Sequence, residues 1–251
     1  MSLGMVCLCL QNINQMMPLM HRKRHEEIYE ALSFFDAKFL IKNQILFGGG
    51  TRIALELNEY RESIDIDFLC PNKASFRAVR QQARSTSLGQ LVLKEFDYIR
   101  EIRADRDAVR CFIKIKDINI KLEFVSFADY DLRPYKSIFP VPCLDQHSCF
   151  LTKILANADR YSDPPFKDIF DLLAMFDAWG EIPQSAWNEA DLHYGRKVIL
   201  YGMQQALLRI EKKPNDFLAI ATGELMIDEK YAQQLLTTTK DRFKAYLSNQ
   251  V

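Results

Sequence analysis

The passage GGGTRIALELNEYRESIDIDF, residues 48–68, contains the two patterns that decide the fold. It opens with three glycines and Thr51, which separate the apolar run 44–47 from a stretch whose apolar residues have helical spacing. It closes with an alternation of apolar residues and aspartates, which is typical of a strand with one solvent-facing side. The passage therefore predicts a strand, a glycine turn, a helix and a second strand in succession.

The glycine turn is a candidate phosphate-binding element. A strand followed by Gly49, Gly50 and Thr51 and then by a helix presents backbone N–H groups and a hydroxyl at a helix N-terminus. Such groups bind phosphate through hydrogen bonds and the helix dipole, and Arg52 would add positive charge. The alternative is a tight turn that requires a left-handed backbone conformation. The passage is neither a P-loop nor a dinucleotide-binding G-x-G-x-x-G motif.

The two aspartates form a candidate metal site. Because side chains alternate along a strand, Asp65 and Asp67 point the same way while their apolar neighbours face the core. Two carboxylates at this spacing repel each other unless water or a cation separates them. Mg²⁺, or Mn²⁺ in its place, is the natural counter-ion, since it takes oxygen ligands and keeps positions open for phosphate oxygens. The alternative is an ordinary solvated strand face.

A third carboxylate stands on a later strand. In the segment 118–125, Lys121 and Glu123 share one face and alternate with apolar residues. Sites that combine metal ions and a substrate generally use a further carboxylate from another strand, so Glu123 is the candidate. The alternative is a Lys–Glu pair on an exposed strand.

A later helix offers positive charge. Lys153, Ala156, Asn157 and Arg160 fall on one helix face, where two cations can neutralise a triphosphate or a leaving pyrophosphate. On the next helix, Asp168 and Asp171 are three residues apart. These aspartates can orient Lys153 and Arg160 or act as a base. The alternative is a salt-bridged helix pair that joins the two halves of the chain, which we favour for Asp171.

The order of patterns predicts an α+β fold followed by a helical part. We expect a mixed sheet with flanking helices over residues 1–142, which the resemblance described below identifies as nucleotidyltransferase-type, and a C-terminal helical domain over residues 143–251. Expected helices cover about 22–40, 51–58 and 73–87, and most of 148–251. Expected strands cover 44–47, 64–68, 96–103, 109–116 and 118–127.

Composition describes an ordinary globular protein without overall charge. The 251 residues include 33 basic and 33 acidic side chains, so a nucleic-acid partner would need a local basic patch. One candidate is a helix face with Arg77, Arg80 and Arg84, which is also typical of a solvated surface. The six cysteines lack zinc-site spacing, and residues 1–20 read as neither a signal peptide nor a membrane span. We therefore expect a cytoplasmic protein with no membrane partner.

The residues named above resemble the nucleotidyltransferase signature of the AbiEii/AbiGii abortive-infection toxins, in the DNA polymerase β-like nucleotidyltransferase superfamily. Three parts of that signature are present in order. The first is Gly49-Gly-Thr51 followed by Arg61-x-Ser63-x-Asp65-x-Asp67, and the second is Lys121-x-Glu123. The third is helical and consists of Lys153-Ile-Leu-Ala156, Arg160, Lys167-Asp168 and Asp171-Leu172. The resemblance covers about residues 44–175. Lys167 departs from it, because the family usually has arginine there, and this exchange keeps the charge but loses the planar two-pronged donor.

The resemblance implies a metal-dependent nucleotidyltransferase. Asp65, Asp67 and Glu123 would hold the metal, and Gly49, Gly50, Thr51, Arg52, Lys153 and Arg160 would contact a nucleoside triphosphate. It also implies a toxin role, a cognate antitoxin and an RNA acceptor such as the end of a tRNA. Two alternatives stay open: transfer to a small molecule or a protein, and a nucleotide-binding module of the same fold without turnover.

Overall fold

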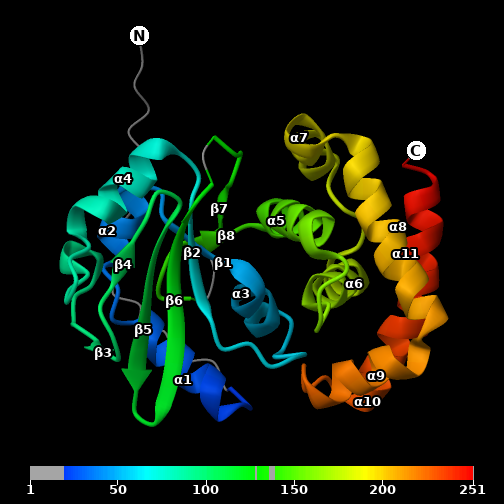
Figure 1. The fold of residues 1–251 in the computed structure, drawn as a ribbon, viewed down its shortest axis with the longest axis horizontal. Coiled ribbons are helices and arrows are strands. Elements are labelled where there is room, and N and C mark those ends of the chain that lie inside the picture. Colours follow the sequence, from blue (N-terminus) through cyan, green and yellow to red (C-terminus); the bar gives the residue numbers. More distant parts are fainter. Residues whose placement is uncertain (1–19, 128, 136–138, 251) are drawn as a thin grey trace.

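A mixed β-sheet forms the centre of the N-terminal half (Figure 1). The computed structural model describes residues 20–127, 129–135 and 139–250. Within them the sheet has eight strands, which are β1 Leu46–Gly48, β2 Ile66–Cys70, β3 Asp97–Tyr98, β4 Arg103–Ala104, β5 Ala108–Ile115, β6 Ile118–Ser126, β7 Pro134–Tyr135 and β8 Cys143–Leu144. Their order is β3-β5-β6-β2-β1-β8-β7, with β4 paired to β5.

The register of the central strands positions the candidate site. β2 runs parallel to β6, and Asp67 on β2 lies opposite Glu123 on β6. β1 is antiparallel to β2, with Gly48 opposite Asp67. The glycines, one aspartate and the glutamate are thus neighbours across three adjacent strands.

Helices cover both faces of the sheet. On one face lie α1 Lys23–Leu32, α2 Ala37–Lys42 and α4 Lys73–Gln82, whose apolar residues join Phe68 and Phe124 in one core cluster. On the other face lie α3 Gly49–Glu56 and α5 Gln146–Arg160, which belong to a second cluster that includes Leu69. In β2, the consecutive residues Phe68 and Leu69 therefore face different cores, as the pleat requires.

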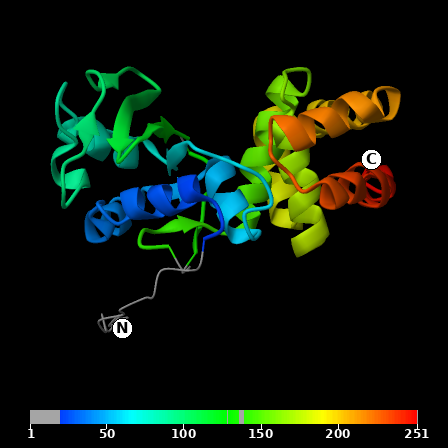
Figure 2. The same cartoon turned by 90° about the horizontal axis from the view of Figure 1, so that it is seen from below.

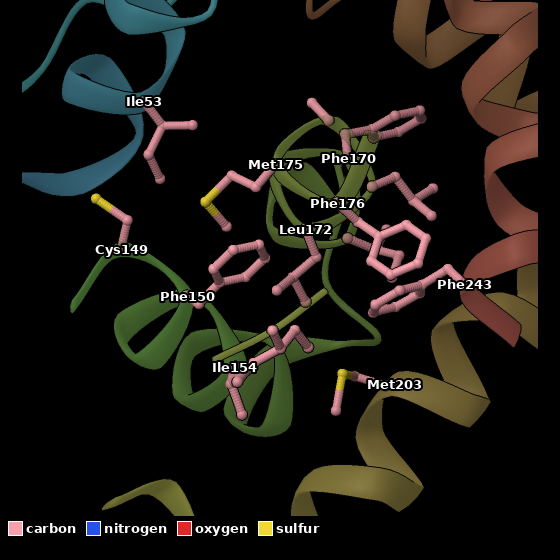
Figure 3. Close-up of a cluster of buried hydrophobic side chains, with 14 of the residues drawn as sticks. Ile53, Cys149, Phe150, Ile154, Phe170, Leu172, Met175, Phe176, Met203 and Phe243 are labelled. Atoms are coloured by element: carbon pink, nitrogen blue, oxygen red, sulfur yellow. The ribbon is translucent and has the colours of Figure 1, made fainter. Parts of the chain in front are cut away.

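The C-terminal half is helical and packs on α3 and α5 (Figures 1 and 2). After α5 it contains α6 Lys167–Trp179, α7 Gln184–Tyr194, α8 Arg196–Lys212, α9 Pro214–Gly223, α10 Glu229–Gln234, the π-helical turn Leu235–Thr239 and α11 Lys240–Ser248. Phe150 of α5, Phe170 and Phe176 of α6 and Phe243 of α11 fill its core together with Met175 (Figure 3). This core continues to Ile53 of α3 and Leu69 of β2, so the helical half shares its core with one face of the sheet.

The predicted α+β architecture is confirmed, with local differences. The helix expected over 22–40 is two helices, because the Asp36 carboxylate accepts hydrogen bonds from the N–H groups of Lys38 and Phe39 and starts α2. The helix expected over 73–87 ends at Gln82, and the strand expected over 96–103 is reduced to β3 and the start of β4. β8 pairs with β1, so residues 143–144 belong to the sheet and the helical half begins with α5.

The expectation about residues 1–20 falls almost wholly outside the described residues. Among the described helices, none is long and apolar enough to cross a membrane. Cys70, Cys111, Cys143 and Cys149 are buried, and Cys7 and Cys9 lie outside the described residues.

Candidate active site

A cleft of about 280 Å³ lies between the α5 side of the sheet and α5 itself. Three segments far apart in the sequence form its walls: the start of α3 with the strand β2, the strand β6, and the helix α5. The cleft is lined by Gly49, Gly50, Arg61, Ser63, Asp65, Asp67, Leu69, Lys121, Glu123, Val125, Phe127, Thr152, Lys153, Ala156, Arg160 and Lys167. The structure thus brings together Gly49, Gly50, the three predicted carboxylates, Lys153 and Arg160.

The glycines allow the backbone to approach two charged side chains closely. Gly49 has a φ of +70°, in the left-handed region that L side chains rarely adopt, and a Cβ there would clash with the Asp67 carboxylate. A Cβ on Gly50 would clash with the Arg61 guanidinium. Gly48 gives no side-chain cap to α3, and Gly49 and Gly50 at the start of that helix line the cleft. The left-handed backbone of Gly49 therefore agrees with the tight-bend interpretation, and the anion site stays a prediction.

Asp65 and Asp67 line the same wall of the cleft. Burial raises the pKa of Asp67 to about 6, and repulsion from Asp65 and Glu123 adds to this effect. A divalent cation between the two aspartates would relieve that repulsion and would find the oxygen ligands it prefers. The chemistry of this pair therefore fits a hard metal ion whose remaining positions are taken by water and phosphate oxygens.

Glu123 lines the cleft, but its carboxylate already has two partners. Arg110 Nε lies 2.6 Å from Glu123 Oε1, and Lys121 Nζ lies 2.5 Å from Oε2. Among the described residues, no group of three or more His, Cys, Asp or Glu side chains is arranged to hold a metal ion. The three expected carboxylates therefore line one cleft without being arranged as a metal-binding group, and Glu123 is paired with Arg110 and Lys121.

A chain of buried ion pairs supports the opposite wall. Lys153 Nζ lies 2.8 Å from Asp168 Oδ1 and 2.6 Å from Asp171 Oδ2. Arg160 donates to Asp168 from Nε at 2.5 Å and from Nη2 at 3.0 Å. Arg61 donates to Asp171 from Nε at 2.7 Å and from Nη2 at 2.9 Å. Three cations that line the cleft are thus held by two carboxylates behind them.

These contacts favour an orienting role for Asp168 over that of a base. Asp168 is 4% exposed and is not among the residues that line the cleft. Burial opposes its charge, but Lys153 and Arg160 outweigh burial and hold its pKa well below the usual range. The attraction of Arg61 and Lys153 likewise outweighs burial and lowers the pKa of Asp171, whose carboxylate also accepts from the Tyr60 hydroxyl. The salt-bridge interpretation that we favoured for Asp171 agrees with this geometry.

Arg52 and Thr51 do not reach the cleft with their side chains. Arg52 is fully buried, pairs with Glu56 one helical turn on, and lies 5.5 Å from the ring centre of Trp179. This corrects the expectation that the Arg52 side chain contacts phosphate: along α3 it points away from the glycines into the interior. The Thr51 hydroxyl is 2.8 Å from the Ser63 hydroxyl, so it braces the segment before Asp65 and leaves only its backbone N–H for a ligand.

Four polar residues of the cleft belong to the motifs of the resemblance but received no role from the sequence. They are Arg61, Ser63, Lys121 and Lys167. Strand alternation puts Lys121 on the same face as Glu123 and could have placed it at the cleft. The spacing of residues within one helix or strand does not place Arg61 or Lys167 there. Lys167 forms no ion pair with any described residue, unlike Lys153 and Arg160. Its ammonium is therefore a cation at the cleft that is not already neutralised by the protein.

Solved structures share this fold. A proposed nucleotidyltransferase from H. pylori is 15% identical and has a TM-score of 0.50, over 90% of this chain and 96% of that chain. JHP933 from Helicobacter pylori is 16% identical with the same TM-score, over 92% of this chain and 96% of that chain. At this level of identity the likeness concerns the fold. A comparison with curated proteins found no match.

A family model gives the identification. The model described as "Nucleotidyl transferase AbiEii toxin, Type IV TA system" matches residues 34–249, which contain every residue that lines the cleft. The chain is therefore a nucleotidyltransferase that belongs to the AbiEii toxin family of type IV toxin–antitoxin systems.

Proposed function

We propose that this enzyme transfers a nucleoside monophosphate from a nucleoside triphosphate to a hydroxyl of an RNA, with Mg²⁺ or Mn²⁺ as cofactor. The observation that carries the proposal is the composition of one cleft. The uncapped start of α3, the Asp65–Asp67 pair and the cations of α5 line the same space. We infer that the start of α3 binds phosphate, the aspartate pair binds the metal, and the cations of α5 bind the leaving pyrophosphate.

Asp65 and Asp67 would hold the metal. When bound, the ion would neutralise phosphate oxygens and align the triphosphate with its acceptor. Glu123 lies opposite Asp67 on the neighbouring strand. It would join the aspartates as a metal ligand if its carboxylate gave up its ion pairs with Arg110 and Lys121. In this structure the contacts with Arg110 and Lys121 hold the Glu123 carboxylate in place at the cleft.

The remaining residues would bind phosphate. The N–H groups at the start of α3, at Gly49, Gly50 and Thr51, suit the oxygens at one end of the triphosphate. Lys167 offers a free ammonium, and Arg160 is about half exposed while its guanidinium rests on Asp168. Lys153 is 5% exposed and pinned by two carboxylates, so it presents a fixed charge to the departing pyrophosphate.

In the proposed reaction the acceptor hydroxyl attacks the α-phosphorus. A new phosphorus–oxygen bond forms to the acceptor as the bond to the bridging oxygen of pyrophosphate breaks. The hydroxyl proton passes to a carboxylate that lines the cleft, and the fixed cations receive the pyrophosphate. Positioning and electrostatics dominate such transfers, which agrees with a site made of charged groups that ion pairs hold in place.

The biological role follows from the family. We propose that the chain acts as a toxin that is countered by a cognate antitoxin, and that its acceptor is the end of a tRNA or another RNA. We also propose a cytoplasmic location, where nucleoside triphosphates and RNA are available. The sheet half, which ends with β8, and the helical half, which begins with α5, supply opposite walls of the cleft, and we propose that both are required.

The test is a transfer assay with Mg²⁺, each labelled nucleoside triphosphate and either total RNA or total protein. The control is the Asp65→Ala/Asp67→Ala variant. Label in RNA that disappears with the control supports the proposal. Label in protein or in small molecules would show that the acceptor is one of these and not RNA. Binding of nucleotide without any transfer would exclude the catalytic function.

A further inference from the structure

A second hollow, of about 530 Å³, lies beside α4 on the face of the sheet that is turned away from the cleft. It is lined by Lys73, Phe76, Arg77, Arg80, Gln81, Arg106, Asp107 and Ser126. Four of these side chains are cations and one is a carboxylate. In a chain with no net charge, this is a local concentration of positive charge.

The helix cations of this hollow are not paired with a carboxylate of any described residue. Lys73, Arg77 and Arg80 stand four and three residues apart, so they form a row along one face of α4. All three are exposed, and none forms an ion pair or side-chain hydrogen bond with a described residue. The fourth cation, Arg106, has only a loose pair with Asp107, at 3.8 Å. Uncompensated like charges in a row suit an extended anion better than a single small one.

The hollow adjoins the nucleotidyl-transfer cleft through the end of one strand. Val125 and Phe127 line the cleft, and Ser126 between them lines the hollow. Because consecutive residues of a strand face opposite ways, the two cavities lie on opposite faces at the same end of β6. A polymeric ligand that extends from the cleft over this end of the sheet therefore reaches Lys73, Arg77 and Arg80 of α4.

We propose that the row formed by Lys73, Arg77, Arg80 and Arg106 binds the phosphate backbone of the RNA whose end enters the cleft. This inference rests on the proposed function and extends it to the acceptor. A repeating anion is favoured over a protein partner, because the only large apolar side chain in the hollow, Phe76, is 6% exposed and offers no anchor. Backbone contacts of this kind position RNA without reading its sequence.

The experiment compares Arg77→Gln/Arg80→Gln with a matched control, Lys197→Gln/Lys230→Gln. Both variants lose two exposed charges. The control lysines lie in the helical half and have no ion-pair partner among the described residues. Substitutions at exposed sites change the stability of the fold little. Binding of fluorescent unfractionated tRNA is measured without nucleotide over a range of salt concentrations, and transfer of labelled nucleotide is measured separately.

For Arg77→Gln/Arg80→Gln we expect about ten-fold weaker tRNA binding at 0.1 M salt. The slope of log K against log salt should fall by about 1.5, since each phosphate contact contributes about 0.7 to 0.9. The KM for RNA should rise while the KM for nucleotide stays unchanged. The control should match the wild type.

Equal tRNA affinity and salt slope in the variant and the control would overturn the inference, even if the wild type labels RNA. A wild type that binds no tRNA would overturn it as well. If the variant loses tRNA binding but the wild type labels only protein or nothing, the RNA surface stands and the proposed reaction fails.

Discussion

Asp67 of β2 and Glu123 of β6 are direct partners in the parallel register of the sheet, and both side chains line the cleft. Backbone hydrogen bonds of two central strands therefore hold the two carboxylates side by side. Asp65 stands just before β2, so it has more freedom than Asp67. A rigid Asp67 beside a more adjustable Asp65 is a suitable arrangement for a metal that arrives with its substrate.

The first prediction concerns the metal. Asp67→Asn should lower the transfer rate by at least about 10²-fold, as loss of a key electrostatic contact does, and should not lower the stability of the metal-free protein, because it removes repulsion from Asp65 and Glu123. Mg²⁺ at about 100 times its Kd should stabilise the wild type by about 2.7 kcal/mol. Thermal unfolding with and without Mg²⁺ checks both statements.

Loss of this Mg²⁺ effect in Asp67→Asn would support the assignment, and an equal effect in both proteins would contradict it. Asp241→Asn is a suitable control, since Asp241 is an exposed carboxylate of the last helix. It should leave both the transfer rate and the Mg²⁺ effect unchanged.

The sequence predicted those parts of the site that depend on local periodicity. Alternation along 64–68 and 118–125 placed Asp65, Asp67 and Glu123 on one face, and helix spacing placed Lys153 with Arg160. It could not show that Arg110, from a neighbouring strand, neutralises Glu123, because pairing between strands is not encoded in the spacing within one strand. It also misplaced the Arg52 side chain, since the direction of the first turn of α3 depends on how that helix packs.

The second prediction concerns the ion pairs behind the cleft. Asp171→Asn leaves Arg61 and Lys153 buried with less negative charge, and should lower the free energy of unfolding by about 3 to 5 kcal/mol. The ion pair of Lys240 with the exposed Asp241 should contribute less than about 1 kcal/mol to the free energy of unfolding. Urea unfolding of Asp171→Asn and Asp241→Asn measures the contrast, and equal effects would refute the structural role of Asp171.

The third prediction is the pH dependence of stability. The pKa values of Asp168 and Asp171 are lowered in the folded protein, so both carboxylates stabilise the fold at any pH above their unfolded pKa of about 3.9. This stabilisation should be lost as the pH falls below about 4 towards their folded pKa values. Urea unfolding between pH 7 and pH 2.5 should therefore show a steeper acid loss in the wild type than in Asp171→Asn. Parallel curves would contradict the assignment.

The fourth prediction separates packing from substrate binding at Arg52. Arg52→Met leaves Glu56 without its partner in a partly buried position and should cost about 3 kcal/mol of stability. The double variant Arg52→Met/Glu56→Gln should recover part of that loss. Because the Arg52 side chain does not line the cleft, the KM for nucleotide should stay within about two-fold of the wild type. A KM raised ten-fold at unchanged stability would restore the role that the sequence suggested.

The fifth prediction returns to the glycines. Gly49→Ala would force alanine into a left-handed conformation, at a cost of about 1 to 2 kcal/mol, and would push its methyl group into the Asp67 carboxylate. Gly50→Ala has no such backbone strain, but its methyl group would displace the Arg61 guanidinium from Asp171. Both variants should lose at least about ten-fold in transfer rate, since small displacements at a reacting site are costly.

Gly223→Ala is the matched control, because nothing lies within 4 Å of a Cβ at that position and its backbone is not left-handed. It should retain full activity and gain a little stability through the reduced freedom of the unfolded chain. The two active-site variants should also differ from each other. Gly49→Ala should weaken the Mg²⁺ effect on unfolding, because it moves a metal ligand, whereas Gly50→Ala should leave that effect intact and lower stability through the ion pairs. The same response in both would mean that the turn acts only as a bend.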